Sequence, residues 1–102
     1  MGYGLPPPTI GPHSLNVELV QLDTVIYPRI RARIQAVPSP QVQRQYEMQV
    51  EARMNLLDAI VPLLIENMGG HNDPRVTIGL IHRALMQIQW LREFDAYLTR
   101  TG

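Results

Sequence analysis

The chain has 102 residues, enough for one domain with a modest core, and its nine acidic and nine basic residues cancel to a net charge of zero. This balance excludes a general field that would attract nucleic acid or an anionic membrane, and the absence of cysteine excludes disulfides and thiolate chemistry. No signal-peptide pattern begins the chain and no apolar run reaches the about 20 residues that span a bilayer, so we expect a soluble cytoplasmic or virion protein without membrane contact.

The first segment, residues 1–13, is predicted to be an extended arm. It holds three of the seven glycines and four of the nine prolines, and its three consecutive prolines favour the polyproline II conformation over helix. An arm of this composition can bury little against itself, so we expect it to dock on the protein's own helices or on a neighbouring subunit. In the leading hypothesis the arm docks on a neighbouring subunit, and the residues assigned to this interface are Leu5, Pro6, Pro7, Pro8 and Ile10.

A first amphipathic helix is predicted over residues 14–37. Ser14 can act as its N-cap, and apolar residues follow at spacings of three and four, which place them on one stripe of a helix. This stripe consists of Leu15, Leu19, Leu22, Ile26, Ile30, Ile34 and Val37. Pro28 interrupts the pattern, because proline lacks the N–H group needed in a helix interior and disfavours helical angles in the residue before it. Two shorter helices or one kinked helix are therefore expected.

The part after Pro28 has two interpretations. Between residues 29 and 37, apolar residues alternate with arginine and glutamine, which is also the pattern of a half-buried strand. We favour the helix, because alanine, arginine and glutamine all have high helix propensity.

Arg29, Arg31 and Arg33 are the densest charge in the chain. On a helix they spread over more than half a turn, whereas on a strand they would line one face. A contact with phosphate, RNA or a carboxylate is one interpretation; a solvated face with ion pairs to nearby acids is the other. We favour the second, because a nucleic-acid interface usually also brings net positive charge and interleaved aromatic residues. The acids considered are Glu47, Glu51 and Glu66.

The central helix is predicted over residues 40–68. Ser39 can serve as its N-cap with Pro40 as its first residue, and Gly69 or Gly70 offers the left-handed residue that commonly ends a helix. Apolar residues cover most of its girth between residues 56 and 65, so we expect burial on more than one side, in a core or at an interface. The two stripes are Val50, Met54, Leu57, Val61, Leu64 and Met68, and Leu56, Ile60, Leu63 and Ile65.

Pro62 lies inside this apolar run. Its ring removes one helical hydrogen bond, so the helix is either kinked there or stops and restarts; we favour the kink, because the apolar stripe keeps its phase across the proline. Asp58 is the only charge between residues 56 and 65. It is expected to face water or an arginine, with a desolvated catalytic acid as the alternative.

The last helix is predicted over residues 74–99, with Asp73 as N-cap and Pro74 as first residue. The short connection requires it to run antiparallel to the central helix. Its inward stripe comprises Ile78, Ile81, Leu85, Ile88, Leu91, Phe94 and Leu98. Met86, Trp90 and Tyr97 form a flanking stripe. Aromatic packing in the protein's own core is one interpretation of this stripe, and an oligomer contact is the other. We favour the contact, because these residue types are enriched at interfaces and the chain has more apolar helix surface than three helices can hide.

No catalytic, cofactor or metal motif is present in the sequence. His13, His71 and His82 are scattered over the arm, a turn and the last helix, and the two serines are better placed as caps than as nucleophiles. We therefore expect no catalytic residue, cofactor, metal or small-molecule substrate.

Arg29, Arg33 and Arg53, with the acidic–proline–arginine triplet at residues 73–75, resemble the arginines with which the helical chorismate mutases, intertwined dimers of about this length, grip a dicarboxylate. That class also has a lysine in its site. This chain contains no lysine, so the sequence is assigned to no family.

The sequence therefore predicts an all-α fold: a three-helix antiparallel hairpin or bundle, broken at Pro28 and kinked at Pro62, with an extended proline-rich N-terminal arm. The leading hypothesis for function is a non-enzymatic structural or adaptor subunit of an oligomeric assembly, for example a small bacteriophage virion component (capsid, connector or tail assembly), with copies of itself or other subunits as partners. One alternative is a small nucleic-acid-binding or regulatory module that uses the three clustered arginines. A second alternative is a small helical enzyme with an arginine-lined site.

Overall fold

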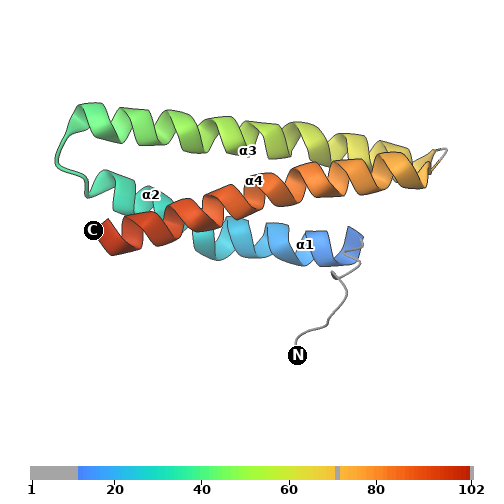
Figure 1. Ribbon diagram of the computed structural model, residues 1–102, viewed down its shortest axis with the longest axis horizontal. Coiled ribbons are helices and arrows are strands. Elements are labelled where there is room, and N and C mark those ends of the chain that lie inside the picture. Colours follow the sequence, from blue (N-terminus) through green and yellow to red (C-terminus); the bar gives the residue numbers. More distant parts are fainter. Residues whose placement is uncertain (1–11, 71, 102) are drawn as a thin grey trace.

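The computed structural model describes the backbone of residues 12–70 and 72–101 and the side chains of residues 14–70 and 72–101. Within these ranges the chain is helical apart from its turns, which confirms the predicted all-α fold (Figure 1). The first helix begins two residues earlier than predicted, and the arm residues Leu5, Pro6, Pro7, Pro8 and Ile10 lie outside the described part. The elements are α1 (Pro12–Gln21), the π-helical turn η1 (Leu22–Ile26), α2 (Tyr27–Gln35), α3 (Pro40–Gly69) and α4 (Pro74–Thr101).

The break expected near Pro28 is one wide turn between two α-helical segments. The N–H of Tyr27 donates to the carbonyl of Leu22, five residues earlier instead of four. Pro28 has no N–H to donate, and its ring would press on the carbonyl of Thr24 in a regular α-helix, so a wide turn directly before it relieves the clash. Residues 29–35 then continue as helix, and the strand interpretation is wrong.

Both long helices begin as predicted. The Oγ of Ser39 accepts a hydrogen bond from the N–H of Val42 at 3.3 Å, and the Oδ1 of Asp73 accepts one from the N–H of Arg75 at 3.0 Å. Each cap satisfies a backbone donor that the first turn of a helix leaves free. α3 continues through Pro62 as one helix, so the alternative of a stop and restart is wrong.

The end of α3 differs from the prediction. Gly69 and Gly70 do not take a left-handed conformation: φ of Gly70 is −108°, and its N–H still donates to the carbonyl of Glu66. The left-handed residue is Asn72, with φ of 48°, and its N–H donates to the carbonyl of Asn67 at 2.8 Å. Asparagine adopts this conformation more readily than most residues, so the chain reverses later than expected.

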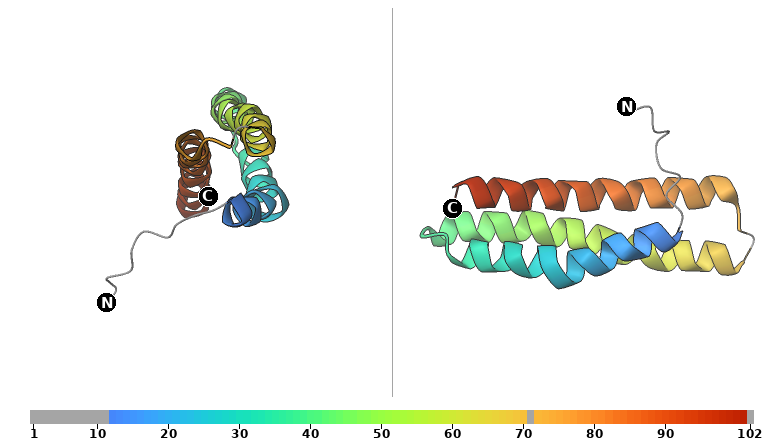
Figure 2. Two further views of the ribbon diagram at one scale, coloured as in Figure 1. Left: turned by 90° about the vertical axis from the view of Figure 1, so that its right-hand side faces the viewer. Right: turned by 90° about the horizontal axis from the view of Figure 1, so that it is seen from below.

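α3 and α4 form a long antiparallel hairpin, and α1, η1 and α2 form a third rod beside it (Figure 1). Viewed end on, the three rods lie at the corners of a triangle (Figure 2). α2 packs against both α3 and α4, whereas α1 packs against α4 and diverges from α3. The buried apolar core comprises Leu15, Leu22, Ile26, Ile30, Ile34, Val50, Leu57, Ile60, Leu64, Ile81, Ala84, Ile88, Leu91 and Leu98.

The closed end of the hairpin extends beyond the start of α1 (Figures 1 and 2). We call this end, residues 63–69 of α3 and 74–80 of α4, the overhang, and the three-helix remainder the body. Several apolar residues that the sequence predicts to be buried are exposed, some where α1 does not extend over the overhang and others on the side of the hairpin that faces away from α1 and α2. They are Leu56, Leu63, Ile65, Met68 and Ile78. No helix in the described part of the chain is both long and apolar enough to cross a membrane.

Candidate functional site: an apolar face of the hairpin

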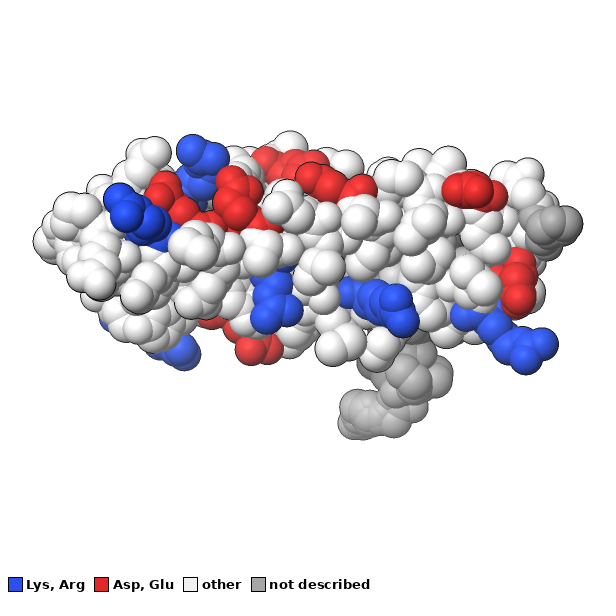
Figure 3. Space-filling view, turned by 90° about the horizontal axis from the view of Figure 1, so that it is seen from above, with Lys and Arg blue, Asp and Glu red and all other residues white. Residues whose placement is uncertain are grey.

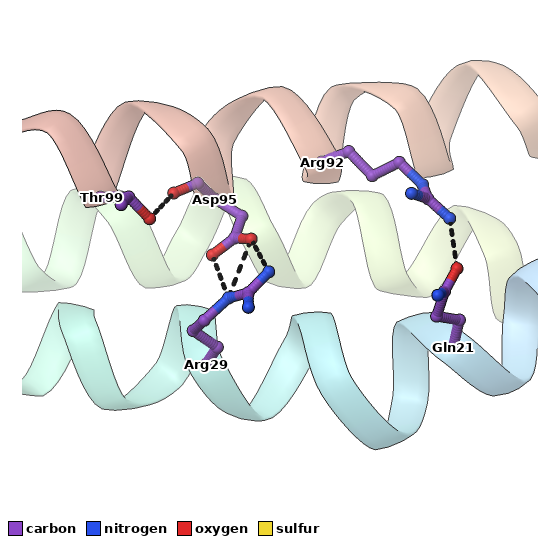
Figure 4. Close-up of polar contacts among 5 residues, drawn as sticks. All are labelled: Gln21, Arg29, Arg92, Asp95 and Thr99. Carbon is purple, nitrogen blue, oxygen red and sulfur yellow. Dashed lines mark hydrogen bonds and ion pairs between the residues drawn. The ribbon is translucent and has the colours of Figure 1, made fainter.

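A bidentate ion pair joins α2 to α4 in the body. The Nε of Arg29 donates to both carboxylate oxygens of Asp95 at 3.0 Å, and its Nη2 donates to Oδ2 at 2.5 Å (Figure 4). The hydroxyl of Thr99 donates to the backbone carbonyl of Asp95 at 2.8 Å. The side chain of Asp95 is 8% exposed and that of Arg29 is 47% exposed. The hydrogen bond to Asp95, and then the charge of that residue, raise the pKa of Arg29. Arg29 is therefore a structural residue that holds α2 on α4.

A second polar contact joins α1 to α4. The Nη2 of Arg92 donates to Glu18 Oε2 at 2.9 Å and to Gln21 Oε1 at 2.8 Å, the latter drawn in Figure 4. Both charged side chains are about one-third exposed, and ion pairs this accessible to water contribute about 0.2–1 kcal/mol. The contact therefore orients α1 on α4 more than it stabilises the fold.

Arg31 lies in a different environment, between α2 and α3. Its Nη1 donates to the hydroxyl of Tyr27 at 3.1 Å, and this hydrogen bond, with smaller contributions from the charges of Glu51 and Glu47, raises the pKa of Arg31. These residues line a pocket of about 160 Å³. Small-molecule sites typically have volumes of about 300–1,000 Å³, so this pocket is small for a ligand.

The structure does not bring the three clustered arginines together. Arg33 is half-buried, and its Nε has no hydrogen-bond partner among the described residues. Arg29 is bound to Asp95 and Arg31 to Tyr27, so each arginine has its own surroundings. Glu47 and Glu51 do lie near Arg31, as the ion-pair interpretation expects, whereas Arg29 has a partner that this interpretation did not consider.

Four aromatic side chains connect α3 and α4 at the open end of the hairpin. Phe94 stacks on Trp90 with ring centres 5.2 Å apart, and Tyr46 meets Phe94 edge-on at 5.2 Å. Tyr97 extends the cluster, and a hydrogen bond with its side chain, followed by burial, raises the pKa of Tyr46. The guanidinium of Arg53 lies 4.7 Å from the centre of the Trp90 ring. Trp90, predicted to be an interface residue, is therefore half-buried by contacts within the protomer.

An apolar surface follows the side of the hairpin that faces away from α1 and α2. In α3 its members are Leu56 and Leu63, which are seven residues apart and share one side of the helix. Leu63 and Val76 line one hollow of about 380 Å³ between the two helices. We call this surface the hairpin face. Its exposed apolar members are Leu56, Leu63, Val76, Met86 and Tyr97, and Trp90 contributes an edge.

Charged side chains lie around the apolar members of the hairpin face. Glu66, Arg83 and Glu93 lie at its hollows, and Arg53 covers Trp90. Figure 3, which views the side where α3 and α4 lie next to each other, shows charged groups separated by broad uncharged areas. Two of the predicted interface residues contribute: Met86 is 57% exposed and Tyr97 is 41% exposed.

The remaining candidates of the sequence analysis do not converge on a site. Asp58 is exposed and lines a groove between α1 and α3 that contains no arginine among its described residues, and Glu66 likewise lies in a hollow without one. His82 is exposed, and the side chains of His13 and His71 lie outside the described part of the chain. Residues 14–70 and 72–101 contain no group of three potential metal ligands.

The arginines that resemble those of the helical chorismate mutases are also separated. Arg53 donates to Gln87 Oε1 at 2.9 Å on the α4 side of α3, whereas Arg29 pairs with Asp95 from α2. No described pocket contains both. Comparisons of the chain with protein-family models, with curated proteins and with solved structures find no significant match.

The sequence analysis missed Asp95, the one charged residue that is buried in the described part of the chain. Its position held a usable signal. Asp95 follows Leu91 by four residues and precedes Leu98 by three, so it falls on the inward stripe of the last helix. A carboxylate on such a stripe needs a cation from another helix, and the arginines of residues 29–33 were the available source.

Proposed function

We propose that the protein is a non-enzymatic structural subunit that associates with further copies of itself through the hairpin face. The observation that supports this most directly is the exposure of Leu56, Leu63 and Val76, at 46%, 52% and 44%, on one side of the hairpin. Soluble monomers rarely leave a contiguous apolar surface of this kind uncovered.

The composition of the hairpin face also fits a contact between proteins. Tryptophan, tyrosine and methionine are enriched at such interfaces, and Trp90, Tyr97 and Met86 lie along one side of α4. The two-helix geometry fits as well, because two such faces packed together would form a helical bundle core of the kind that knobs-into-holes packing fills.

A narrower proposal is that the assembly is a virion, with the chain as a capsid, connector or tail-assembly subunit of a bacteriophage. This rests on analogy in size and mode of assembly, and it is tested by immunolabelling of purified particles. The clustered arginines favour no second function, since Arg29 is bound to Asp95 and Arg31 to Tyr27 within the protomer.

The proposal is tested by charge substitutions on the hairpin face. We expect the unaltered chain to have a native mass that is a multiple of its protomer mass by light scattering. Leu63→Glu with Val76→Glu should reduce this to the protomer mass, because two carboxylates buried at an interface would lose their hydration. Both positions are about half exposed in the protomer, so the circular dichroism of the variant should remain helical.

A matched control is available on α1. Val17 and Val20 are 53% and 52% exposed, and α1 lies on the opposite side of the hairpin. Val17→Glu with Val20→Glu introduces the same charges and should leave the native mass unchanged. A chain that is monomeric at every concentration, or a control pair that dissociates the oligomer as fully as the test pair, would contradict the proposal.

A further inference from the structure

The side of α3 that faces α1 continues into the overhang. In the body, Val61 lines a groove of about 370 Å³ together with Leu19 and Leu22. Ile65 and Met68 follow Val61 by four and seven residues, so they lie on the same side of α3. They are 65% and 44% exposed, because α1 starts at Pro12 and does not extend as far as the overhang.

The matching side of α4 behaves in the same way. Arg92 contacts Glu18 of α1, so it marks the side of α4 that faces α1. Leu85 and Ile78 precede Arg92 by seven and fourteen residues, which places them along the same side. Leu85 is half-buried, whereas Ile78 is 67% exposed. The two stripes therefore leave an apolar surface on the side of the hairpin along which an extension of α1 toward its N-terminus would run.

We propose that residues 1–11 of the same chain fold along the overhang and cover Ile65, Met68 and Ile78. The segment joins α1 at Pro12, at the end of α1 that points toward the overhang (Figures 1 and 2). Eleven extended residues reach at most about 36 Å, and the seven residues of α3 in the overhang span about 10 Å, so length does not limit the contact.

The chemistry of the segment suits this surface. Its side chains carry no charge, and Leu5 and Ile10 can supply apolar cover. The three prolines have no N–H groups, so a chain containing them leaves fewer unsatisfied donors against an apolar surface. Attachment at Pro12 also gives the segment an effective concentration in the millimolar range, which favours its own overhang over that of a second copy.

The test is a thermodynamic cycle on the full chain. The four proteins are the unaltered chain, a variant lacking residues 1–10, Ile78→Ser, and the combination of the two changes. In the full chain we expect Ile78→Ser to raise the unfolding equilibrium constant about 5- to 30-fold. In the truncated chain the same substitution should change it by less than about twofold, as at an ordinary surface position. Ile10→Asp in the full chain should reduce the effect of Ile78→Ser as the truncation does. If the truncated chain does not fold, Ile10→Asp takes its place in the cycle.

Met48 provides the control. It is 66% exposed near the other end of α3, so Met48→Ser should have the same effect with and without residues 1–10. Additive effects of Ile78→Ser and the truncation would overturn the proposal. The proposal would also be overturned if the coupling between Ile78→Ser and the truncation grew with protein concentration. Residues 1–11 of a second copy would then be the segment that covers Ile78. Ile78 is not part of the hairpin face, so the outcome of this cycle is independent of whether copies associate through that face.

Discussion

The body and the overhang are built from the same two helices but differ in what encloses them. In the body α1 and α2 complete the triangle, and Ile30, Ile88 and Leu91 are at most 1% exposed. In the overhang the apolar stripes continue with unchanged spacing, yet Ile65 and Ile78 are 65% and 67% exposed. The difference comes from where α1 begins. Apolar patterning thus shows which side of a helix needs cover, but not which segment or subunit supplies it.

The largest expected difference between the two regions is in the cost of removing a leucine side chain. Leu91→Ala in the body should lower the free energy of unfolding by about 2–5 kcal/mol, because Leu91 is fully buried and the neighbouring helices cannot close the cavity. Leu63→Ala in the overhang should cost less than about 1 kcal/mol, because half of that side chain is already in water. Urea unfolding at a concentration where the chain is monomeric measures both; similar costs would show that the overhang is enclosed as fully as the body.

A smaller effect is expected at the ion pair that attaches α2 to the body. Asp95→Asn should cost about 1–3 kcal/mol, because a buried side chain loses its charge-assisted hydrogen bonds while Arg29, half exposed, can turn toward water. Arg29→Met should cost more than Asp95→Asn, because it leaves the buried carboxylate without a cation.

Urea unfolding compares these two variants, and hydrogen exchange locates the effect. Amide exchange in residues 27–35 and 91–98 should accelerate, while exchange in the overhang keeps its rate, since α2 lies toward the other end of the hairpin (Figure 1). If Arg29→Met were the milder change, the carboxylate of Asp95 would have to be reaching water in the protein.

Local chemistry made most of the fold predictable. Ser39 and Asp73 mark the starts of the long helices because their side chains can accept backbone hydrogen bonds, and both do so. The helix also continues through Pro62 as the phase of the apolar stripe indicated. These features depend on residues within one turn of each other, so they can be read from a single stretch of sequence.

Features that depend on contacts between helices were harder to predict. Glycine is the usual left-handed residue, but Asn67 binds Asp73 and Thr77 across the turn, and the reversal moves to Asn72. Arg29 and Arg31 look like parts of one cluster in sequence, but positions two apart on a helix do not face each other, and the two residues bind Asp95 and Tyr27. Asp95 was missed for a related reason, since its role depends on an arginine 66 residues away.

The smallest expected effect concerns Gly79 in the overhang. A Cβ added at Gly79 would have no neighbour within 4 Å among the described residues, so nothing in that part of the protomer requires glycine there. Gly79→Ala should therefore raise the free energy of unfolding by about 0.5–1 kcal/mol, because alanine restricts the unfolded chain and has the higher helix propensity. Thermal unfolding at low protein concentration measures this, with Ala52→Gly on the exposed surface of α3 as the reverse control.

Native mass at higher concentration adds a second readout to the Gly79 variant. Gly79 lines a hollow with Val76 and Arg83 beside the hairpin face. If copies pack closely there, the added methyl group should weaken their association even though it stabilises each protomer. If Gly79→Ala stabilises the monomer but lowers the native mass at higher concentration, Gly79 lies in the contact between copies. A loss of stability in the monomer would instead mean that the overhang is already covered at Gly79 by part of its own chain.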